Sequence, residues 1–324
     1  MISVVGTGRW GTFLAWYCAE KLNQEVVLIG RDEQSKSYTG LLETGENSFI
    51  KLPADVRLSC DKTFLKNAKY IIISIHSQEL RGFLYNINRE IIQNKKVILC
   101  MKGLEIHTGK RLTEIFREET GNATVGALLG PGHVQEIYAG IPTCMVVDSD
   151  SESYKQEMCK LFNTSLIRIY KGNDLIGNET GAAAKNVIGI AAGFLDALGL
   201  GQLKGALMAR GCYEIGKIIK ALGGRFISAY GLAHLGDYEA TLFSPHSRNR
   251  RFGENFVRGR EGDFYAEGVE TCRALYEISQ KRGIDAPIVE NVYRAIFGGE
   301  DPETLIYRLL YRDVKHEFMP DLLE

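Results

Sequence analysis

"VVGTGRWGT", residues 4–12, contains the glycine pattern Gly6-x-Gly8-x-x-Gly11. A β-branched run precedes it, and a helical pattern and a second β-branched run follow, which together indicate a βαβ unit. In such a unit the first glycine permits a tight turn, the second lets backbone approach a pyrophosphate, and the third lets helix and strand pack closely. The stretch therefore predicts a dinucleotide-binding fold, rather than a glycine-rich turn that binds nothing. The expected strand, helix and strand are residues 2–5, 12–22 and 25–29.

Composition limits the classes of protein that the chain can belong to. Its 324 residues favour two domains, and 45% hydrophobic with 24% charged residues is ordinary for a soluble globular protein. With 39 basic and 40 acidic residues, a dedicated nucleic-acid or membrane-surface binder is not expected. Seven single cysteines favour a reducing cytoplasm, and six histidines without ligand spacing predict no metal site.

Strand-like and helix-like stretches alternate through the first half of the chain, and helical patterns dominate after about residue 177. The alternation predicts a mostly parallel, doubly wound sheet. We therefore expect a Rossmann-like dinucleotide-binding domain at residues 1–177 and an all-α substrate domain at residues 178–324. Residues 181–201 are long and largely apolar but include Lys185 and Asp196, so they predict a buried core helix and no membrane span. The further strands expected in the first half are residues 70–75, 96–100, 123–129, 143–147 and 166–170, with helices at 79–93 and 109–120; the later helices are expected at 179–197, 205–222, 262–282 and 288–297.

Two lysines stand where chemistry is expected. Lys102 follows the fourth strand, and ligands of doubly wound folds bind beyond the carboxyl ends of strands. A surface lysine at the start of a loop is the alternative. Lys185 lies among small apolar residues in "GAAAKN", where desolvation would lower its pKa and make a proton-transferring amine. A lysine that reaches solvent from a partly exposed helix is the alternative there.

Residues 231–256 hold an arginine cluster after Asp237. Ser247 is a good helix N-cap, and Arg248 with its two neighbouring arginines offers planar donors suited to phosphate oxygens. A phosphate site, a nucleic-acid patch and a solvated basic face are all compatible with this cluster, and the near-neutral chain disfavours the second.

Seven segments in order resemble the NAD(P)-dependent glycerol-3-phosphate dehydrogenase family: "GTGRWGT", "KGLE", "GPGHVQEIYAGIPT", "NETGAAAKNVIGIAAGFLDALGLG", "GLAHLGD", "SRNRRFG" and "AEGVET". The resemblance implies a Rossmann-like fold and an enzyme that interconverts dihydroxyacetone phosphate and sn-glycerol 3-phosphate by hydride transfer with NAD(P)(H). Such an enzyme supplies glycerol 3-phosphate for phospholipid synthesis. Its partner would be this small-molecule substrate, and whether the chain forms a homodimer stays open.

The resemblance also implies roles for individual residues. The catalytic residues would be Lys185, Lys102 and Asp237. The substrate would contact these three together with Gly130, Thr241, Ser247, Arg248 and Asn249. The cofactor would contact Gly6, Gly8, Arg9, Trp10, Gly11, Arg31, Lys102, Val134, Arg248 and Glu267.

Several positions depart from the usual family pattern. His76 stands where proline is usual, Gly132-His133-Val134 where Ser-Phe-Ala is usual, and Arg9 where a small residue is typical. The missing serine hydroxyl removes one substrate contact. Two other functions are compatible with the sequence. One is a related two-domain ketone or hydroxyacid reductase, and the other is a non-catalytic NAD(P)-binding sensor.

The end of the second strand, "VVLIGRDE", bears on the choice of cofactor. Arg31 can pair with a 2′-phosphate, and Gly30 is interpreted as leaving room for it. Asp32 could instead accept the ribose hydroxyl or cap the next helix. We predict that NADPH is used at least as well as NADH.

Overall fold

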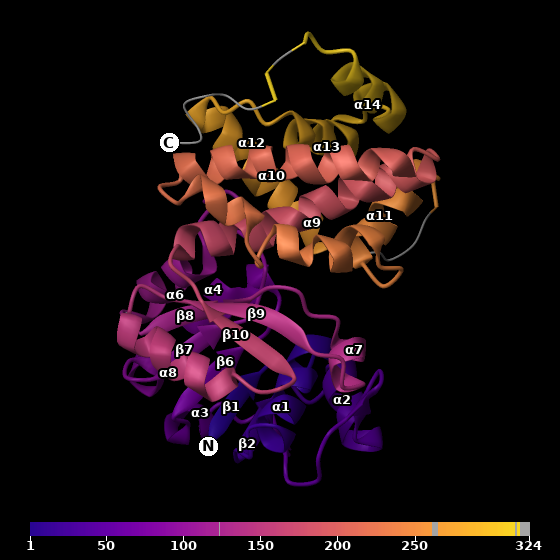
Figure 1. Ribbon diagram of the computed structural model, residues 1–324. Coiled ribbons are helices and arrows are strands. Elements are labelled where there is room, and N and C mark those ends of the chain that lie inside the picture. The colour runs from indigo at the N-terminus through magenta and orange to yellow at the C-terminus, as the bar shows by residue number, and fades with distance from the viewer. Residues whose placement is uncertain (123, 261–264, 315, 318–324) are drawn as a thin grey trace. The chain divides into compact units, whose positions relative to one another are not determined.

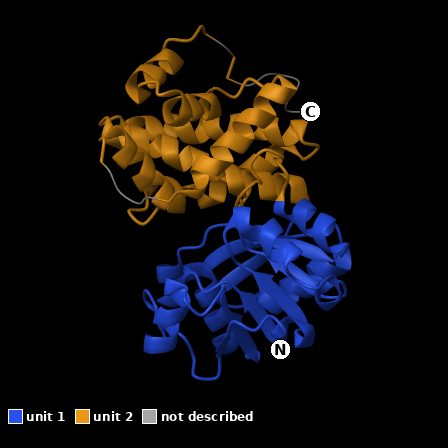
Figure 2. Cartoon of the chain, turned by 180° about the vertical axis from the view of Figure 1, so that it is seen from behind, with its two compact units in different colours: residues 1–101, 112–173 blue, residues 102–111, 174–324 orange. Residues whose placement is uncertain are grey.

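The computed structural model describes residues 1–122, 124–260, 265–314 and 316–317. The chain forms two compact units (Figure 2). Unit 1 comprises residues 1–101 and 112–173, and unit 2 comprises residues 102–111 and 174–324. The segment 102–111 thus belongs with the later part of the chain. The predicted single boundary after residue 177 does not describe this exchange.

Unit 1 is built on an eight-stranded sheet of order β10-β9-β8-β7-β6-β1-β2-β5 (Figure 1). All neighbours pair in parallel except β8 and β9, which are antiparallel. Taken in chain order, the six parallel strands from β5 to β8 have the 3-2-1-4-5-6 arrangement of Rossmann folds. The strands are β1 (Ile2–Val5), β2 (Val26–Ile29), β5 (Arg57–Ser59), β6 (Tyr70–Ile73), β7 (Lys96–Leu99), β8 (Val125–Leu129), β9 (Thr143–Asp148) and β10 (Ile167–Lys171); β3 (Glu46–Asn47) and β4 (Ile50–Lys51) form a separate hairpin.

The predicted parallel sheet is confirmed, whereas the helix expected at residues 79–93 is wrong in its extent. That stretch divides into a 3₁₀ turn, η1 (Ser77–Glu79), and two short helices. The second of these starts afresh because the side chain of Asn88 accepts the backbone N–H of Glu90 and so caps a new N-terminus. The helices of unit 1 are α1 (Arg9–Glu20), α2 (Lys36–Thr44), α3 (Phe64–Asn67), α4 (Leu80–Tyr85), α5 (Arg89–Ile92), α6 (Leu112–Thr120), α7 (Val134–Tyr138) and α8 (Glu152–Phe162).

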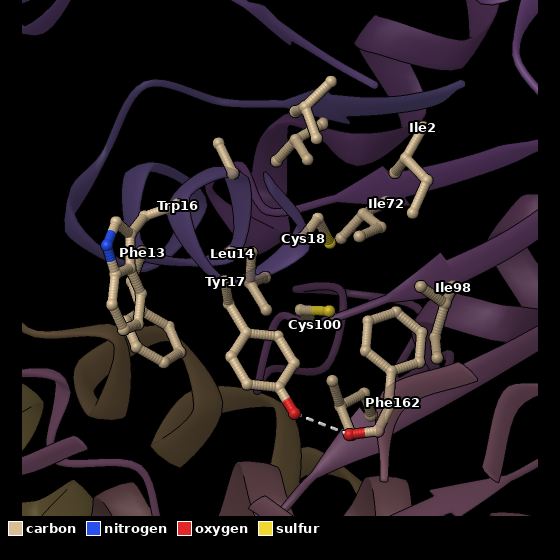
Figure 3. Packing of buried hydrophobic residues seen from close by; sticks show 14 of the residues in the cluster. Ile2, Phe13, Leu14, Trp16, Tyr17, Cys18, Ile72, Ile98, Cys100 and Phe162 are labelled. Atoms are coloured by element: carbon tan, nitrogen blue, oxygen red, sulfur yellow. Dashed lines mark hydrogen bonds between the residues drawn. The ribbon is translucent and has the colours of Figure 1, made fainter. Parts of the chain in front are cut away.

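Alternating side chains of the sheet feed two separate cores. On β6, Tyr70 and Ile72 join one cluster, and the intervening Ile71 joins the other. The first cluster includes α1 and α8, and Figure 3 shows it around Tyr17, whose hydroxyl donates to the carbonyl of Phe162 at 2.7 Å. The second includes residues of α3, α4, α5 and α6. The sheet is therefore covered on both faces, as a doubly wound fold requires.

The glycines of the opening motif lie where the strand order reverses, between β1 and β6. Gly6 has φ +112°, and a Cβ there would stand 2.2 Å from the Ser74 carbonyl oxygen. A Cβ on Gly11 would stand 1.9 Å from the Gly6 oxygen, so the start of α1 contacts the loop backbone. Only glycine allows both the positive φ at Gly6 and the close backbone approach at Gly11, which confirms the close packing expected of this motif.

Unit 2 is helical. Its long helix α9 (Leu175–Ala197) is buried along most of its length, which confirms the core helix predicted for the apolar segment. None of the helices in the described part of the chain has the length and apolarity that a membrane crossing requires. The other elements are η2 (Gly201–Leu203), α10 (Lys204–Ala221), η3 (Phe226–Tyr230), η4 (Leu235–Asp237), the π-helical η5 (Glu239–Phe243), α11 (Arg248–Val257), α12 (Glu267–Arg282), α13 (Pro287–Gly298) and α14 (Pro302–Leu310). Ala123 and residues 262–264, which begin a predicted strand and helix, lie outside the described residues.

Glycines bring α9 and α11 into backbone contact. A Cβ on Gly193 would stand 2.0 Å from the Arg250 carbonyl oxygen, and one on Gly253 would stand 2.2 Å from that of Ile190. One helical turn after Lys185, a Cβ on Gly189 would stand 2.7 Å from a methyl carbon of Thr241 and 3.3 Å from Cβ of Asn249. These small residues hold α11 against the turn of α9 that follows Lys185.

Candidate active site

Lys185 projects from the middle of α9 into a buried polar cluster. It is 8% exposed, and its neighbours Ala182 to Ala184 are fully buried. Its Nζ lies 2.7 Å from Asp237 Oδ2 and donates to Thr241 Oγ1 at 2.8 Å. Asp237 is itself 1% exposed. The interpretation of Lys185 as a solvated lysine on a partly exposed helix is therefore wrong, because its ammonium group has protein partners inside unit 2.

Lys102 binds the same carboxylate oxygen. Its Nζ lies 2.7 Å from Asp237 Oδ2, and its side chain is 19% exposed. The segment that carries Lys102 is fastened to α9 at two points. Asn186 Nδ2 donates to the Lys102 carbonyl at 3.3 Å, and Arg111 pairs with the buried Glu179 at 2.8 Å. One carboxylate thus joins two lysines from segments 83 residues apart in the sequence.

The cluster has one more positive than negative charge when both lysines are ammonium ions. Burial lowers the pKa of Lys185 from 10.5 to about 8. Asp237 opposes this shift by attraction and hydrogen bonding, while the ammonium group of Lys102 adds to it by repulsion. A lysine in this setting exchanges a proton near physiological pH, which an ordinary surface lysine does not.

Asp237 is the last residue of η4, and Thr241 lies in the π-helical η5 that follows. The hydroxyl of Thr241 donates to the Asp237 carbonyl at 2.7 Å and accepts from Lys185. Residues 239–243 form a π-helical turn, a conformation that is often found at functional sites. The turn directs both side chains at one ammonium group.

The three arginines at the start of α11 have different environments. Ser247 caps the helix by accepting the backbone N–H of Arg250, as predicted. Arg250 is bound to Asp196 at 2.6 Å and to the Ser244 carbonyl at 3.1 Å, so it has a structural partner. Arg248 and Arg251 are exposed, and within the described residues neither forms an ion pair. Both of these guanidinium groups are thus available to an anion, and Arg248 is the one at the first helical position, next to the Ser247 cap.

Asn249 of α11 contacts the backbone at the start of α12, where Glu267 also lies. The side-chain oxygen of Asn249 accepts the backbone N–H of Gly268 at 2.9 Å, which leaves its amide group as a donor. Glu267 begins α12, and its charge raises the pKa of Lys185. Unit 2 therefore gathers Lys102, Lys185, Asp237 and Thr241 into direct contact, and α11 adds Asn249 beside the next turn of α9.

The predicted cofactor residues of unit 1 surround the glycine loop. Gly8 is exposed, and no atom lies within 4 Å of a Cβ built on it, so the loop has the open approach that a pyrophosphate needs. The first turn of α1 carries no acidic residue. Its N–H groups and dipole therefore suit a dinucleotide.

The other residues of unit 1 that are predicted to contact cofactor or substrate have different surroundings. The Trp10 indole covers Gly132, where a Cβ would stand 2.9 Å from the ring, and Arg9 lies 5.9 Å from the Phe49 ring centroid. Gly130 has φ +125° at the end of β8. Val134 is buried in the core of unit 1, so its contact with a ligand is limited to what its 5% exposed surface allows.

The end of β2 differs from the sequence interpretation at Gly30. The space beside Gly30 is taken by the ring of Tyr38, which would stand 2.5 Å from a Cβ there, so the idea that Gly30 leaves room for a phosphate is wrong. Asp32 accepts the backbone N–H of Gln34 at 2.9 Å and so stabilises the turn before α2. Arg31 forms an exposed ion pair with Glu79 of η1.

The strand order, the glycine loop and the buried lysine cluster together define a dinucleotide-dependent dehydrogenase. Residues 1–155 match the family described as NAD-dependent glycerol-3-phosphate dehydrogenase N-terminus, and residues 174–307 match its C-terminus. The chain therefore belongs to the NAD-dependent glycerol-3-phosphate dehydrogenase family, and it is an oxidoreductase.

Individual relatives agree along the whole chain. Two proteins named glycerol-3-phosphate dehydrogenase (NAD(P)+), from Clostridium botulinum strains Eklund 17B / Type B and Alaska E43 / Type E3, are 38% and 36% identical, and each alignment covers 98% of both chains. The crystal structure of glycerol-3-phosphate dehydrogenase from Coxiella burnetii is 28% identical, with a TM-score of 0.88 over 96% of this chain and 98% of that one. The alternatives of a different reductase and of a non-catalytic sensor are not favoured.

The sequence interpretation missed several parts of the site. It did not pair Asp237 with both lysines, and it did not foresee the roles of Arg111 and Glu179 in fastening Lys102. Arg111 lies outside the segments that resemble the family, and Glu179 lies inside one, but neither position indicates its partner, because the pairing arises only when residues 102–111 fold onto α9. Among the described residues, no group of three or more histidine, cysteine or acidic side chains is arranged to hold a metal ion.

Proposed function

We propose that this chain reduces dihydroxyacetone phosphate to sn-glycerol 3-phosphate with NAD(P)H, and carries out the reverse oxidation, through the cluster of Lys185, Asp237 and Lys102. The observation that carries the proposal is the buried Lys185, which shares one carboxylate oxygen with Lys102 and has a pKa of about 8. A ketone reduction needs a proton donor beside the carbonyl oxygen, and a lysine with this pKa is matched to neutral pH.

When bound, a nicotinamide cofactor would supply the hydride that the ketone carbon needs. Lys185, as an ammonium ion, stabilises the negative charge that develops on the ketone oxygen and transfers its proton to it. In the oxidation the neutral amine of Lys185 accepts the hydroxyl proton. Asp237 and Thr241 hold the amine in place, and Lys102 contributes a second positive charge.

The substrate phosphate is assigned to the start of α11. Arg248 offers a planar fork of hydrogen-bond donors, and the amide group of Asn249 is a further donor. The N-terminus of the ten-residue α11 adds its positive dipole end near Ser247. The pyrophosphate of the cofactor is assigned to the glycine loop of unit 1, at Gly8 and the start of α1.

The reaction is tested by following the loss of NAD(P)H absorbance with dihydroxyacetone phosphate as substrate. Dihydroxyacetone and a panel of 2-oxo acids serve as comparison substrates. Rapid turnover confined to the phosphorylated ketone supports the proposal. Preference for a 2-oxo acid would instead point to a hydroxyacid reductase and overturn it.

The pH dependence should follow the protonation of Lys185. Reduction requires the ammonium form, so kcat/KM for dihydroxyacetone phosphate should stay level below the Lys185 pKa of about 8 and fall above it. Oxidation requires the free amine, so its kcat/KM should rise up to about pH 8 and then level. Both profiles are measured by initial rates in buffers of constant ionic strength. A reduction profile that stays flat up to about pH 10 would contradict the role of Lys185 as proton donor.

For the cofactor, we propose that NADPH is used at least as well as NADH. Arg31 is 65% exposed, and its partner Glu79 is also exposed, so their ion pair is weak and a 2′-phosphate can displace the carboxylate. Asp32 has one oxygen engaged with Gln34, which makes it a poorer acceptor for a ribose hydroxyl.

Arg31→Ala should weaken NADPH binding by about tenfold or more and leave NADH binding within about twofold, since a charge-assisted hydrogen bond contributes roughly 1.5–3 kcal/mol. Glu79→Gln is the matched variant, because it frees Arg31 and should favour NADPH. Nicotinamide fluorescence titrations give the two dissociation constants. A wild-type preference for NADH of about tenfold would refute the proposed preference, and equal losses with both cofactors would remove Arg31 from the 2′-phosphate role.

Two further proposals concern domain organisation and location. Residues 1–177 are proposed as the cofactor domain, apart from residues 102–111, which pack with unit 2, and residues 178–324 as the substrate domain, supported by the location of the glycine loop and of the lysine cluster. The chain is proposed to act in the cytoplasm, on account of its seven single cysteines, and without nucleic-acid partners, on account of its near-neutral charge. A homodimer stays open, and sedimentation or light scattering of the purified chain would decide it.

A further inference from the structure

We propose that His234 and Tyr238 are positioning residues, which hold the turn that carries Asp237 against α9 and so set the contact of Asp237 with Lys185. The proposal rests on the proposed function for its catalytic meaning. It is based on two buried hydrogen bonds, from Tyr238 to His234 and from His234 to the Gly181 carbonyl, which lie beside the lysine cluster.

The two side chains bracket Asp237 in the sequence and are both completely buried. His234 Nδ1 lies 2.8 Å from the Gly181 carbonyl oxygen, and His234 Nε2 lies 2.6 Å from the Tyr238 hydroxyl. A carbonyl oxygen can only accept, so Nδ1 carries the proton and Nε2 accepts from Tyr238. The ring is neutral, because burial lowers the pKa of His234 to about 4. Burial also raises the pKa of Tyr238 well above 10, so its hydroxyl remains a donor.

The contact with α9 falls at a sensitive place. Gly181 precedes Lys185 by one helical turn, and in a regular α-helix its carbonyl also accepts the backbone N–H of Lys185. A Cβ on Gly181 would stand 3.0 Å from Cβ of His234, so glycine there lets the histidine approach the helix. His234 thus binds the turn of helix from which Lys185 projects.

Tyr238 fixes the other side of Asp237 to α10. A Cβ on Gly211 would stand 2.9 Å from the Tyr238 hydroxyl, so glycine there lets the tyrosine approach the backbone of α10. With its neighbours on both sides held, Asp237 has little freedom to turn its carboxylate away from the two lysines. The geometry of the proton donor therefore depends on a pair that touches neither substrate nor cofactor.

The test uses Tyr238→Phe, which removes one hydroxyl and keeps the ring, together with His234→Ala and His234→Asn. The amide group that His234→Asn introduces can still donate toward the Gly181 carbonyl, so this variant should recover part of the loss. Tyr213→Phe is the matched control, since it removes a hydroxyl from another buried tyrosine, which lies on α10. Measurements are kcat, KM, thermal unfolding, and the pH dependence of Lys185 acetylation by limiting acetic anhydride, read by mass spectrometry.

We expect Tyr238→Phe and His234→Ala to lower kcat by about tenfold or more, with KM for NAD(P)H changed less than about twofold. In Tyr238→Phe the midpoint of Lys185 labelling should fall below the pKa of about 8, because a displaced Asp237 no longer raises it. The other charges that act on Lys185 there, Lys102 and Glu267, are unchanged.

A lower melting temperature with unchanged kcat and an unchanged labelling midpoint would show that the pair is only structural and would overturn the proposal. The labelling needs no turnover. If the wild-type chain fails to reduce dihydroxyacetone phosphate, the proposed reaction fails, while the labelling midpoint in Tyr238→Phe still decides the role of the pair.

Discussion

Replacement of Lys185 by alanine should lower kcat for dihydroxyacetone phosphate reduction by at least about two orders of magnitude. The variant loses the proton donor, which contributes on the order of 10²–10⁴ in rate, and also the charge that stabilises the developing alkoxide. Asp237 keeps Lys102 as a partner at 2.7 Å, so the substitution does not leave a buried carboxylate unpaired. We therefore expect a folded protein whose NAD(P)H affinity is nearly that of the wild type.

Two comparison variants separate chemistry from structure. Lys185→Arg keeps a positive charge beside Asp237 but cannot release a proton near neutral pH, so it should also lose most of its turnover. Lys281→Ala removes an exposed lysine of α12 and should have wild-type kinetics. Steady-state kinetics give the turnover, NADH fluorescence titration gives the cofactor affinity, and circular dichroism shows whether each variant is folded. Turnover near that of the wild type in folded Lys185→Ala would show that another group donates the proton.

Replacement of Arg248 by alanine should raise KM for dihydroxyacetone phosphate by about 10- to 150-fold, which corresponds to the loss of roughly 1.5–3 kcal/mol for a charge-assisted hydrogen bond. The same substitution should change kcat/KM for unphosphorylated dihydroxyacetone much less. The reason is local: Arg248 begins α11 with an exposed guanidinium, whereas Arg250 is already bound to Asp196.

Arg251→Ala is the matched control for this prediction, because Arg251 lies in the same turn and is also exposed. It should leave KM for the phosphorylated substrate within about twofold if the effect of Arg248 is specific and not a general loss of positive charge. Equal losses on dihydroxyacetone phosphate and dihydroxyacetone in Arg248→Ala would mean that the phosphate is bound elsewhere. Inorganic phosphate as a competitive inhibitor gives an independent measurement of the same contact.

Local sequence patterns were sufficient for the features that depend on neighbours along the chain. The glycine loop, its flanking strands and the buried helix around Lys185 were all predicted, because periodicity and glycine spacing act within a single element. Ser247 was predicted as a helix cap for the same reason. The extent of the helix expected at 79–93 was wrong, because Asn88 restarts the helix through a side-chain hydrogen bond that competes with the periodic pattern.

The resemblance to a family named the residues of the site but not their contacts. Lys102, Lys185 and Asp237 were each expected to take part, yet nothing in their spacing showed that both amines share one carboxylate oxygen. The three arginines of "SRNRR" were indistinguishable in sequence. Only packing separated Arg250 from the other two, by placing Asp196 beside it and leaving Arg248 and Arg251 exposed.

The sequence by itself thus determined the parallel dinucleotide-binding sheet, the helical second part and the residue types available for hydride and proton transfer. The tertiary structure decided that residues 102–111 join α9, that glycines bring α11 to the turn after Lys185, and that Tyr38 fills the space beside Gly30. Secondary structure follows from interactions over a few residues, which periodicity records. The pKa of Lys185 depends on burial and on charges distant in sequence, which become neighbours only when the helices of unit 2 pack together.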